Sequence, residues 1–271
     1  MSSLAATVDP TQPAAWQMAR WAISDALLLT RRNLLVWLRV PAYIVFTVVQ
    51  PVIFVLLFRY VFGGAIPVKT AGGYVDYLMP GIIGQTAAFA SFATAIALAQ
   101  EAKTGVIDRF RSMPMARSAV LAGRLLADSV RMLITILVIV AVGYAVGFRF
   151  HNGVLGAIGM VLIAEAFGVT ICCVSAFIGL AIRDEESVQA FGLIWIFPLT
   201  FVSSAFVPIA SMPGWLQAFA NNQPATIVIN TMRSLALGGP INPGLWQSFA
   251  WMAGILLVFA PLAVRAYRRA T

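Results

Sequence analysis

A single acidic residue, Glu165, stands inside a long apolar stretch of this chain, between Val154 and Ile182. If that stretch is a helix that crosses a membrane, Glu165 lies roughly 16 Å from its start, at about 1.5 Å per residue. An ionisable group near the middle of a bilayer is expected to face a cavity or a polar partner. Two interpretations follow: Glu165 lines a route for cationic amphiphiles, or it is a protonated carboxyl group bonded to a neighbouring helix.

Residues that could carry out catalysis are scarce. A hydrolase needs a nucleophile and a base, or metal ligands, at one depth, but the only histidine, His151, falls in a predicted loop. Cys172 and Cys173 are adjacent, which is not a metal-ligand spacing, so we expect them to be packing residues. No Gly-x-x-x-x-Gly-Lys-Ser/Thr phosphate-binding loop occurs in the sequence. We therefore predict that this chain alone is not an enzyme and binds no metal or cofactor.

The apolar residues are grouped in blocks long enough to cross a membrane. Of 271 residues, 61% are hydrophobic and 10% are charged, whereas a soluble domain has roughly 25% charged residues. A spanning helix needs about 20 apolar residues. We therefore predict an all-α integral membrane protein with one transmembrane domain, residues 15–271, after a disordered tail at 1–14. The six predicted spans are 41–62, 78–99, 119–147, 154–182, 188–207 and 248–264.

Lysine and arginine residues are distributed unevenly between the predicted loops. Six spans place both termini on one side, and fourteen of the eighteen basic residues fall on that side. Positive charge in short loops marks the cytoplasmic side, so we predict cytoplasmic termini and a location in the plasma membrane. The same distribution accounts for the net charge of +8 without a nucleic-acid partner.

Two segments on the inner side are predicted to be helices that do not span. Residues 16–39 have apolar residues at helical spacing, but arginines interrupt the run, which favours an amphipathic helix lying in the headgroup region. Residues 100–118 have apolar residues at helical spacing before Pro114, which indicates a short amphipathic helix. Such a helix could dock into a groove on a cytoplasmic partner; the alternative is a solvated loop with ordinary positive-inside charge.

The outer segment 208–247 is too apolar for a solvated loop and too often interrupted for a span. It contains two short apolar stretches, which we predict to be re-entrant helices covered by protein or water. A cap resting on the membrane surface is the alternative. In the fifth predicted span, Trp195, Phe197 and Phe201 are candidates for an aromatic passage, although aromatic residues that face lipid would have the same pattern.

These segments, in this order, resemble the permease subunits of type-2 ABC exporters, specifically the bacterial drug-resistance class that includes daunorubicin export permeases. In the inner loop the matching residues are Glu101, Gly105, Arg109 and Pro114, followed by Ala122-Gly123-Arg124 and Asp128. In the outer segment they are Val207-Pro208, Met212-Pro213-Gly214-Trp215-Leu216, Gln223-Pro224, Arg233 and Gly238-Gly239. The resemblance extends over nearly the whole chain.

The resemblance implies a permease that exports a hydrophobic or amphiphilic compound and a separate ATP-binding cassette subunit that holds ATP and Mg. It also implies a second permease copy, identical or related, in contact with membrane lipid. The inner loop would be the coupling helix, with the candidate residues Glu101, Gly105, Asp108, Arg109, Phe110, Arg111 and Pro114. The candidates in the outer re-entrant segment are Pro213, Gly214, Trp215, Pro224 and Arg233, and those on the substrate route are Glu165, Trp195, Phe197 and Phe201.

Two other transport functions compete with drug export. An exporter of lipid-linked polysaccharide or cell-wall glycolipid would have similar spans, but the chain length and the Pro-Gly-Trp outer segment favour the drug class. A secondary transporter usually has several polar groups at the midplane and broken helices in inverted repeats. The sequence has one acidic residue at that depth and no convincing repeat.

Overall fold

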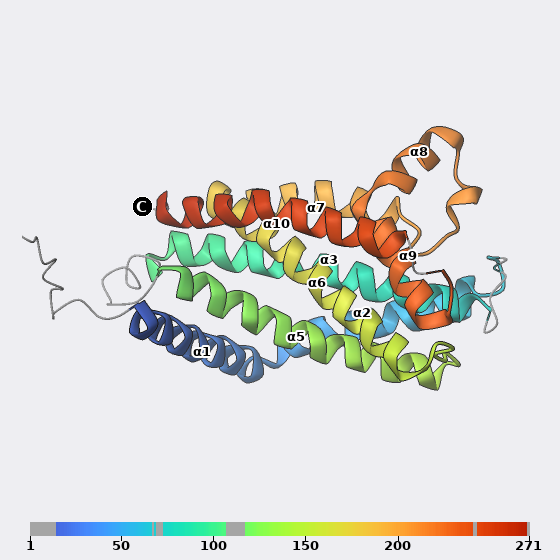
Figure 1. The fold of residues 1–271 in the computed structure, drawn as a ribbon, viewed down its shortest axis with the longest axis horizontal. Helices are drawn as coiled ribbons and strands as arrows, with labels where there is room; N and C mark the ends of the chain where they lie inside the picture. Colours follow the sequence, from blue (N-terminus) through green and yellow to red (C-terminus); the bar gives the residue numbers. More distant parts are fainter. Residues whose placement is uncertain (1–14, 67, 69–72, 107–116, 241–242, 270–271) are drawn as a thin grey trace, which may run out of the picture.

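The computed structural model describes residues 15–66, 68, 73–106, 117–240 and 243–269. Within these ranges the chain is helical apart from turns and short connections, and no strand occurs among them, which confirms the all-α class. The long helices run side by side along one axis (Figure 1). In chain order the elements are α1 (Ala15–Arg39), α2 (Pro41–Leu57), η1 (Phe58–Phe62), α3 (Tyr74–Lys103), α5 (Arg117–Ala145), α6 (Gly153–Ile182), α7 (Glu185–Phe201), η2 (Ile209–Ser211), α8 (Gly214–Asn222), α9 (Pro224–Leu237) and α10 (Gly244–Arg269).

Four of the described helices are long and apolar enough to cross a bilayer. They are α3, residues Ala119–Ala145 of α5, α6, and residues Gly244–Tyr267 of α10. The helices α2 and α7 have 17 residues each, and the π-helical turn η1 lengthens the first of them. A helix therefore lies at each of the six predicted spans, but α7 ends at Phe201 instead of continuing to residue 207.

Where the chain leaves the helical path after α7, two tyrosines of α3 donate to the carbonyl oxygens of Ser204 and Phe206. The hydroxyl of Tyr77 donates to the carbonyl oxygen of Ser204 at 2.9 Å, and that of Tyr74 donates to Phe206 at 2.9 Å. A backbone carbonyl away from water is costly unless it has a donor. These tyrosines supply donors for a non-helical segment, which local apolar pattern alone does not predict.

The centre of the bundle is formed by α3 and α6. A Cβ atom at Gly179 of α6 would lie 2.2 Å from the carbonyl oxygen of Ala95, so the two backbones are in direct contact. Across the same interface, the hydroxyl oxygens of Ser91 and Ser175 lie 2.9 Å apart and share a hydrogen bond. Small residues and short polar side chains of this kind hold membrane helices together. By contrast, most of α10 lies on the outside of the bundle.

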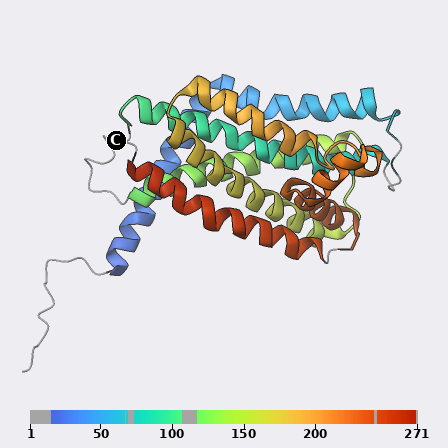
Figure 2. The same cartoon turned by 90° about the horizontal axis from the view of Figure 1, so that it is seen from above.

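At one end of the bundle, α1 crosses the long helices at a steep angle (Figure 2). It packs on α5, where a Cβ atom at Gly123 would lie 2.7 Å from the carbonyl oxygen of Ala26. The hydroxyl of Thr30 also donates to the Gly123 carbonyl at 3.1 Å. Other side chains of α1, including Trp21 and Ile23, are apolar and exposed. The predicted helix is present, and it has apolar residues both against α5 and on its exposed surface.

The helices α8 and α9 lie at the end of the bundle opposite to α1 and to the last described turn of α10 (Figure 1). Residues Val228, Met232 and Ala236 of α9 are buried, so this helix is packed into the bundle. On α8, Trp215 and Phe219 are exposed. The predicted tail, 1–14, and most of the predicted docking helix, 107–116, lie outside the described residues.

Candidate functional site

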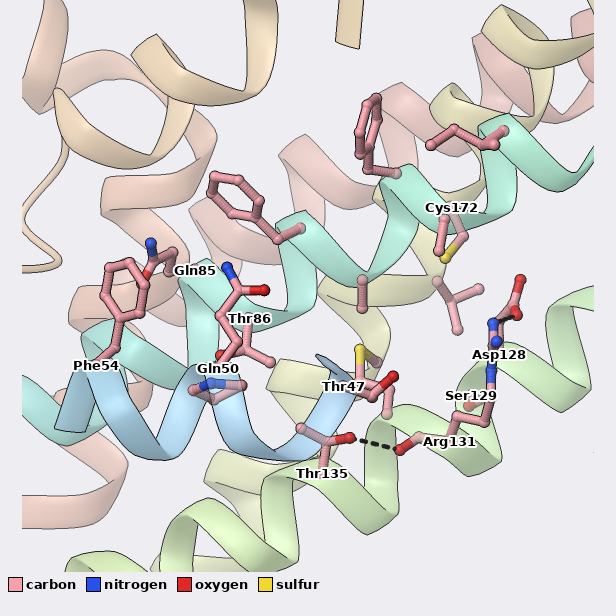
Figure 3. Close-up of a pocket in the computed structure, with 18 residues that line it drawn as sticks. Thr47, Gln50, Phe54, Gln85, Thr86, Asp128, Ser129, Arg131, Thr135 and Cys172 are labelled. Carbon is pink, nitrogen blue, oxygen red and sulfur yellow. Dashed lines mark hydrogen bonds and ion pairs between the residues drawn. The ribbon is translucent and has the colours of Figure 1, made fainter. Parts of the chain in front are cut away.

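Four helices, α2, α3, α5 and α6, line a partly open cavity of about 260 Å³ (Figure 3). Its apolar walls include the rings of Phe54, Phe89 and Phe92. Its polar side chains, apart from one pair of opposite charges, are Thr47, Gln50, Gln85, Thr86, Ser129 and Thr135. The cavity thus combines an apolar wall with a few separated hydrogen-bonding groups, which is the usual composition of a small-molecule site.

Helical spacing brings the lining residues of each helix onto one face. Residues separated by three, four or seven positions lie above one another on an α-helix. On α3 this spacing aligns Gln85, Phe89, Phe92 and Ile96, and on α5 it aligns Asp128, Met132 and Thr135. The cavity is therefore built from continuous stripes on facing helices.

The charged side chains of the cavity belong to a chain of contacts that extends to the last turn of α3. Asp128 forms an ion pair with Arg131 and accepts a hydrogen bond from the hydroxyl of Thr94 at 2.6 Å. Nε of Arg124 lies 3.7 Å from Asp128 Oδ2, and Nη1 of Arg124 lies 3.4 Å from Glu101 Oε1. Buried charges persist only when they are paired. Arg124 therefore connects Glu101 with the cavity.

Glu165 lies next to the cavity, behind one of its lining residues. The hydroxyl of Ser129, on α5, donates to Glu165 Oε2 at 2.8 Å. The other carboxyl oxygen, Oε1, is buried and accepts no hydrogen bond from the described residues. The structure thus contains the bond to a neighbouring helix that one interpretation of this residue expects, and it also leaves one oxygen available.

A series of aromatic rings leads away from the cavity. Phe89, on the cavity wall, meets Phe197 edge to face with ring centres 5.8 Å apart. Phe197 stacks on Phe201 at 5.1 Å, and Phe201 stacks on Phe206 at 5.3 Å. Phe206 in turn stacks on Phe58 at 4.4 Å. Two of the three aromatic residues predicted to form a passage therefore belong to one continuous series of rings.

The third predicted aromatic residue, Trp195, lies apart from this series. It is partly buried and packs against the main hydrophobic core. Because Trp195 and Phe197 are two positions apart on α7, they project from different sides of the helix. The sequence shows that this segment is rich in aromatic residues. Only the packing of α7 shows that Trp195 belongs to the core and Phe197 to the series of rings.

Two of the seven predicted coupling residues lie within the described part of the chain. Glu101 is in α3 and contacts Arg124 at 3.4 Å. Gly105 follows the helix with φ of +71°, a left-handed conformation that favours glycine. The other five, Asp108, Arg109, Phe110, Arg111 and Pro114, lie outside the described residues.

The predicted outer residues occupy helix starts and an anchoring contact. Pro213 precedes α8, Gly214 begins it, and Pro224 begins α9. At a helix start the missing backbone N–H of proline costs little. The side chain of Trp215 is exposed. Arg233 has a separate role, because it ties α9 to other elements.

Arg233 is the centre of a polar network at this end of the bundle. Its guanidinium donates to the carbonyl oxygen of Tyr77 from Nε at 3.2 Å and from Nη2 at 3.1 Å. It also donates to the Ser204 carbonyl at 2.8 Å and lies 3.7 Å from the centre of the Tyr77 ring. Arg233 therefore fixes α9 against α3 and the segment after α7.

The cavity includes residues to which sequence reasoning assigned no part in a site, namely Gln50, Gln85, Asp128 and Arg131. Polar residues inside apolar spans are rare and tend to be functional, so the two glutamines carried a usable signal. Asp128 appeared in the sequence only as part of a family motif, whereas the structure places it on the cavity wall with 6% of its surface exposed.

Comparisons with known proteins agree with this architecture. Residues 25–237 match the family described as ABC-2 type transporter. The chain belongs to the ABC-2 type transporter family. This confirms the resemblance found in the sequence, and it establishes that the chain is an integral membrane protein.

Curated relatives of this ABC-2 chain align with most or nearly all of its length. The daunorubicin resistance ABC transporter permease protein DrrB1 of Streptomyces coeruleorubidus is 32% identical, over 99% of this chain and 98% of the relative. The probable doxorubicin resistance ABC transporter permease protein DrrC of Mycobacterium tuberculosis is 31% identical, over 97% and 95%. A putative transport permease, ycf38, of Pyropia yezoensis is 24% identical, over 77% and 72%.

Proposed function

We propose that this chain is the transmembrane permease subunit of an ATP-driven exporter that moves hydrophobic or amphiphilic compounds across the plasma membrane. The observation that carries the proposal is the cavity between α2, α3, α5 and α6, in which aromatic walls surround a few polar groups. Two relatives that align with nearly the whole chain are named for resistance to daunorubicin and doxorubicin. A cavity of this composition suits compounds of that general kind.

The volume of the cavity favours a small molecule over a lipid-linked polysaccharide. Sites for drug-sized ligands occupy roughly 300 to 1,000 Å³, and this cavity, at about 260 Å³, is slightly below the lower limit of that range. A polysaccharide or glycolipid head group requires far more room. The series of rings from Phe89 to Phe58 provides an apolar route from the cavity along α7.

In this proposal a separate cytoplasmic subunit binds and hydrolyses ATP, because the sequence of this chain has no phosphate-binding loop. ATP and Mg would be held by that ATP-binding cassette subunit. The inner segment that begins at Glu101 would contact it, and the Arg124 bridge would transmit its movement to Asp128 on the cavity wall. A second permease copy, identical or related, would complete the transporter within the lipid.

The proposed topology has six spans, with α2–η1 and α7 as the two short ones, and both termini in the cytoplasm. The packing of α9 against α3 and α6 supports a re-entrant outer segment, because its polar backbone is covered by protein as an interior location requires. Reporter fusions after Arg269 and after Trp215 test this topology. We expect cytoplasmic activity for the first fusion and external activity for the second.

The decisive experiment combines this chain with a co-purified ATP-binding subunit in lipid vesicles. We expect ATP-dependent transport of a fluorescent hydrophobic dye, and ATP hydrolysis that depends on the permease. A permease-free sample and a subunit with an inactivated ATP site are the controls. Absence of dye transport, together with ATP hydrolysis that is indifferent to the permease, would contradict the proposal.

A further inference from the structure

The cavity wall includes a side-chain amide that has no hydrogen-bond partner within the described part of the chain. Gln85 is 6% exposed and lines the cavity, and its amide is not among the polar atoms that are fully buried without a partner. The small exposed part of this residue therefore faces the cavity. An amide in such a place is unfavourable without a partner, and the partner comes from inside the cavity, as water or as a ligand.

The surroundings of Gln85 define what such a ligand would look like. Phe89 follows it by one helical turn on α3, and Phe54 lines the cavity from α2. Figure 3 shows Gln50, Gln85 and Phe54 near one end of the cavity, away from Asp128, Ser129 and Arg131. Aromatic side chains prefer to pack with other rings in stacked or edge-to-face arrangements. This end therefore suits a planar ring with a polar atom on its edge.

The charged end of the cavity does not compete for that ligand atom. Asp128 and Arg131 form an ion pair, and Thr94 and Arg124 also contact the Asp128 carboxylate. Opposite charges that neutralise one another contribute little net attraction for a charged ligand. The neutral amide of Gln85 is an uncommitted group, which offers a carbonyl acceptor and two N–H donors.

We infer that Gln85 is a specificity-determining residue of this cavity. Its amide bonds to a carbonyl or hydroxyl oxygen on a planar aromatic compound whose ring packs against Phe54 and Phe89. Gln50, on the facing helix α2, offers a second amide at the same end. This inference rests on the proposed function, because it names the chemical class of compound that the exporter takes from the membrane.

The test compares two fluorescent probes of nearly equal shape. A hydroxyflavone carries a carbonyl and a hydroxyl group on its rings, whereas phenylnaphthalene has a similar outline and no oxygen. Each is titrated without ATP against the full permease–ATPase complex in lipid nanodiscs, with empty nanodiscs as the blank. For Gln85→Leu we expect about tenfold weaker binding of the hydroxyflavone, the loss caused by removing about one hydrogen bond, and unchanged binding of phenylnaphthalene.

Matched variants separate recognition from folding. Gln85→Met, which keeps a long side chain of similar shape, repeats the test if Gln85→Leu yields too little folded complex. Gln189→Leu makes the same substitution at an exposed position on α7, and we expect no change with either probe. Phe89→Ala should weaken both probes, because it removes ring packing and no hydrogen bond.

The outcomes are distinct. Selective loss of hydroxyflavone binding in the Gln85 variants supports the inference. Equal loss for both probes, or no loss for either, overturns it, and in that case ATP-dependent transport of hydrophobic dyes by the wild-type complex would leave the proposed function standing. If the wild-type complex transports no compound and its ATP hydrolysis does not depend on the permease, the proposed function itself fails.

Discussion

The two polar networks of this bundle differ in how completely they are satisfied. At the end that carries α8 and α9, Arg233 donates to two backbone carbonyls and lies over the ring of Tyr77. In the cavity, the ion pair of Asp128 with Arg131 is closed in the same way, but the amide of Gln85 is left open. Both networks lie among apolar helices, where an unpaired polar group is costly.

This difference distinguishes polar groups that stabilise the fold from polar groups that are available to a ligand. A network in which every group has a partner holds elements together and offers nothing to a ligand. A network with an unpartnered group can form a hydrogen bond with a ligand that enters the cavity. The polar residues of the cavity and those around Arg233 therefore predict opposite effects of substitution, on transport in the first case and on stability in the second.

The largest effect is expected at the closed network. Arg233→Met removes the guanidinium that donates to the carbonyls of Tyr77 and Ser204, although the Ser204 carbonyl keeps the Tyr77 hydroxyl as a donor. The loss should cost about 3 kcal/mol and lower Tm by about 8 °C. Thermal unfolding in nanodiscs measures this change. Arg20→Met, on the exposed surface of α1, is the control. An unchanged Tm for Arg233→Met would show that the closed network does not stabilise the fold.

A smaller effect on stability and a large one on coupling are expected at Arg124. Arg124→Gln removes the bridge between Glu101 and Asp128. We expect about a tenfold loss of dye-stimulated ATP hydrolysis, corresponding to about 1.4 kcal/mol of coupling free energy, while dye binding is retained.

The double variant Glu101→Gln/Arg124→Gln sharpens this prediction. Because both residues belong to one chain of contacts, we expect little further loss beyond the single variants. Arg265→Gln, an exposed residue on α10, should behave as the wild type. Fully additive losses in the double variant would argue that Glu101 and Arg124 act separately.

A selective and moderate effect is expected at Glu165. This residue is intermediate between the satisfied and the unsatisfied groups, because one of its carboxyl oxygens accepts a hydrogen bond and the other does not. Glu165→Gln keeps the shape of the side chain and removes its capacity for charge. We expect roughly threefold lower export of cationic amphiphiles and unchanged export of neutral ones. Paired efflux assays with a cationic and a neutral dye measure the ratio of cationic to neutral export. The same ratio in the wild type and in Glu165→Gln would exclude Glu165 from substrate selection.

The smallest effect is expected at the start of α7. The backbone N–H of Ser187 donates to Asp184 Oδ2 at 3.0 Å, and this bond lowers the pKa of the Asp184 carboxyl group below its ordinary value. The stabilising contribution is present above the unfolded-state pKa, about 3.9, and is lost as pH falls through the lower folded-state pKa.

Asp184→Ala should therefore lower Tm slightly at neutral pH, and the difference from the wild type should disappear in strong acid. Thermal unfolding at several pH values measures this change. Glu186→Ala, in the same turn, is the control for loss of charge alone. A difference in Tm that stays constant through the acidic range would contradict the capping role.

The sequence alone determined where the helices lie and what kind of protein this is. Apolar blocks of bilayer length, amphipathic spacing in residues 16–39, and a proline or glycine at most breaks are local features, and local features set helix positions. The family followed from the order of short motifs. The end of α7 was misplaced because it depends on tyrosines of α3, which lie more than a hundred positions away.

Only the tertiary structure decided how polar residues on different helices meet. Thr94 and Asp128, Glu101 and Arg124, and Ser129 and Glu165 are 34, 23 and 36 positions apart. Their contacts arise from the packing of α3, α5 and α6, which side-chain shape sets and hydropathy does not report. For the same reason Gln85 is an ordinary polar residue in the sequence, and becomes a candidate recognition group once four helices close around it.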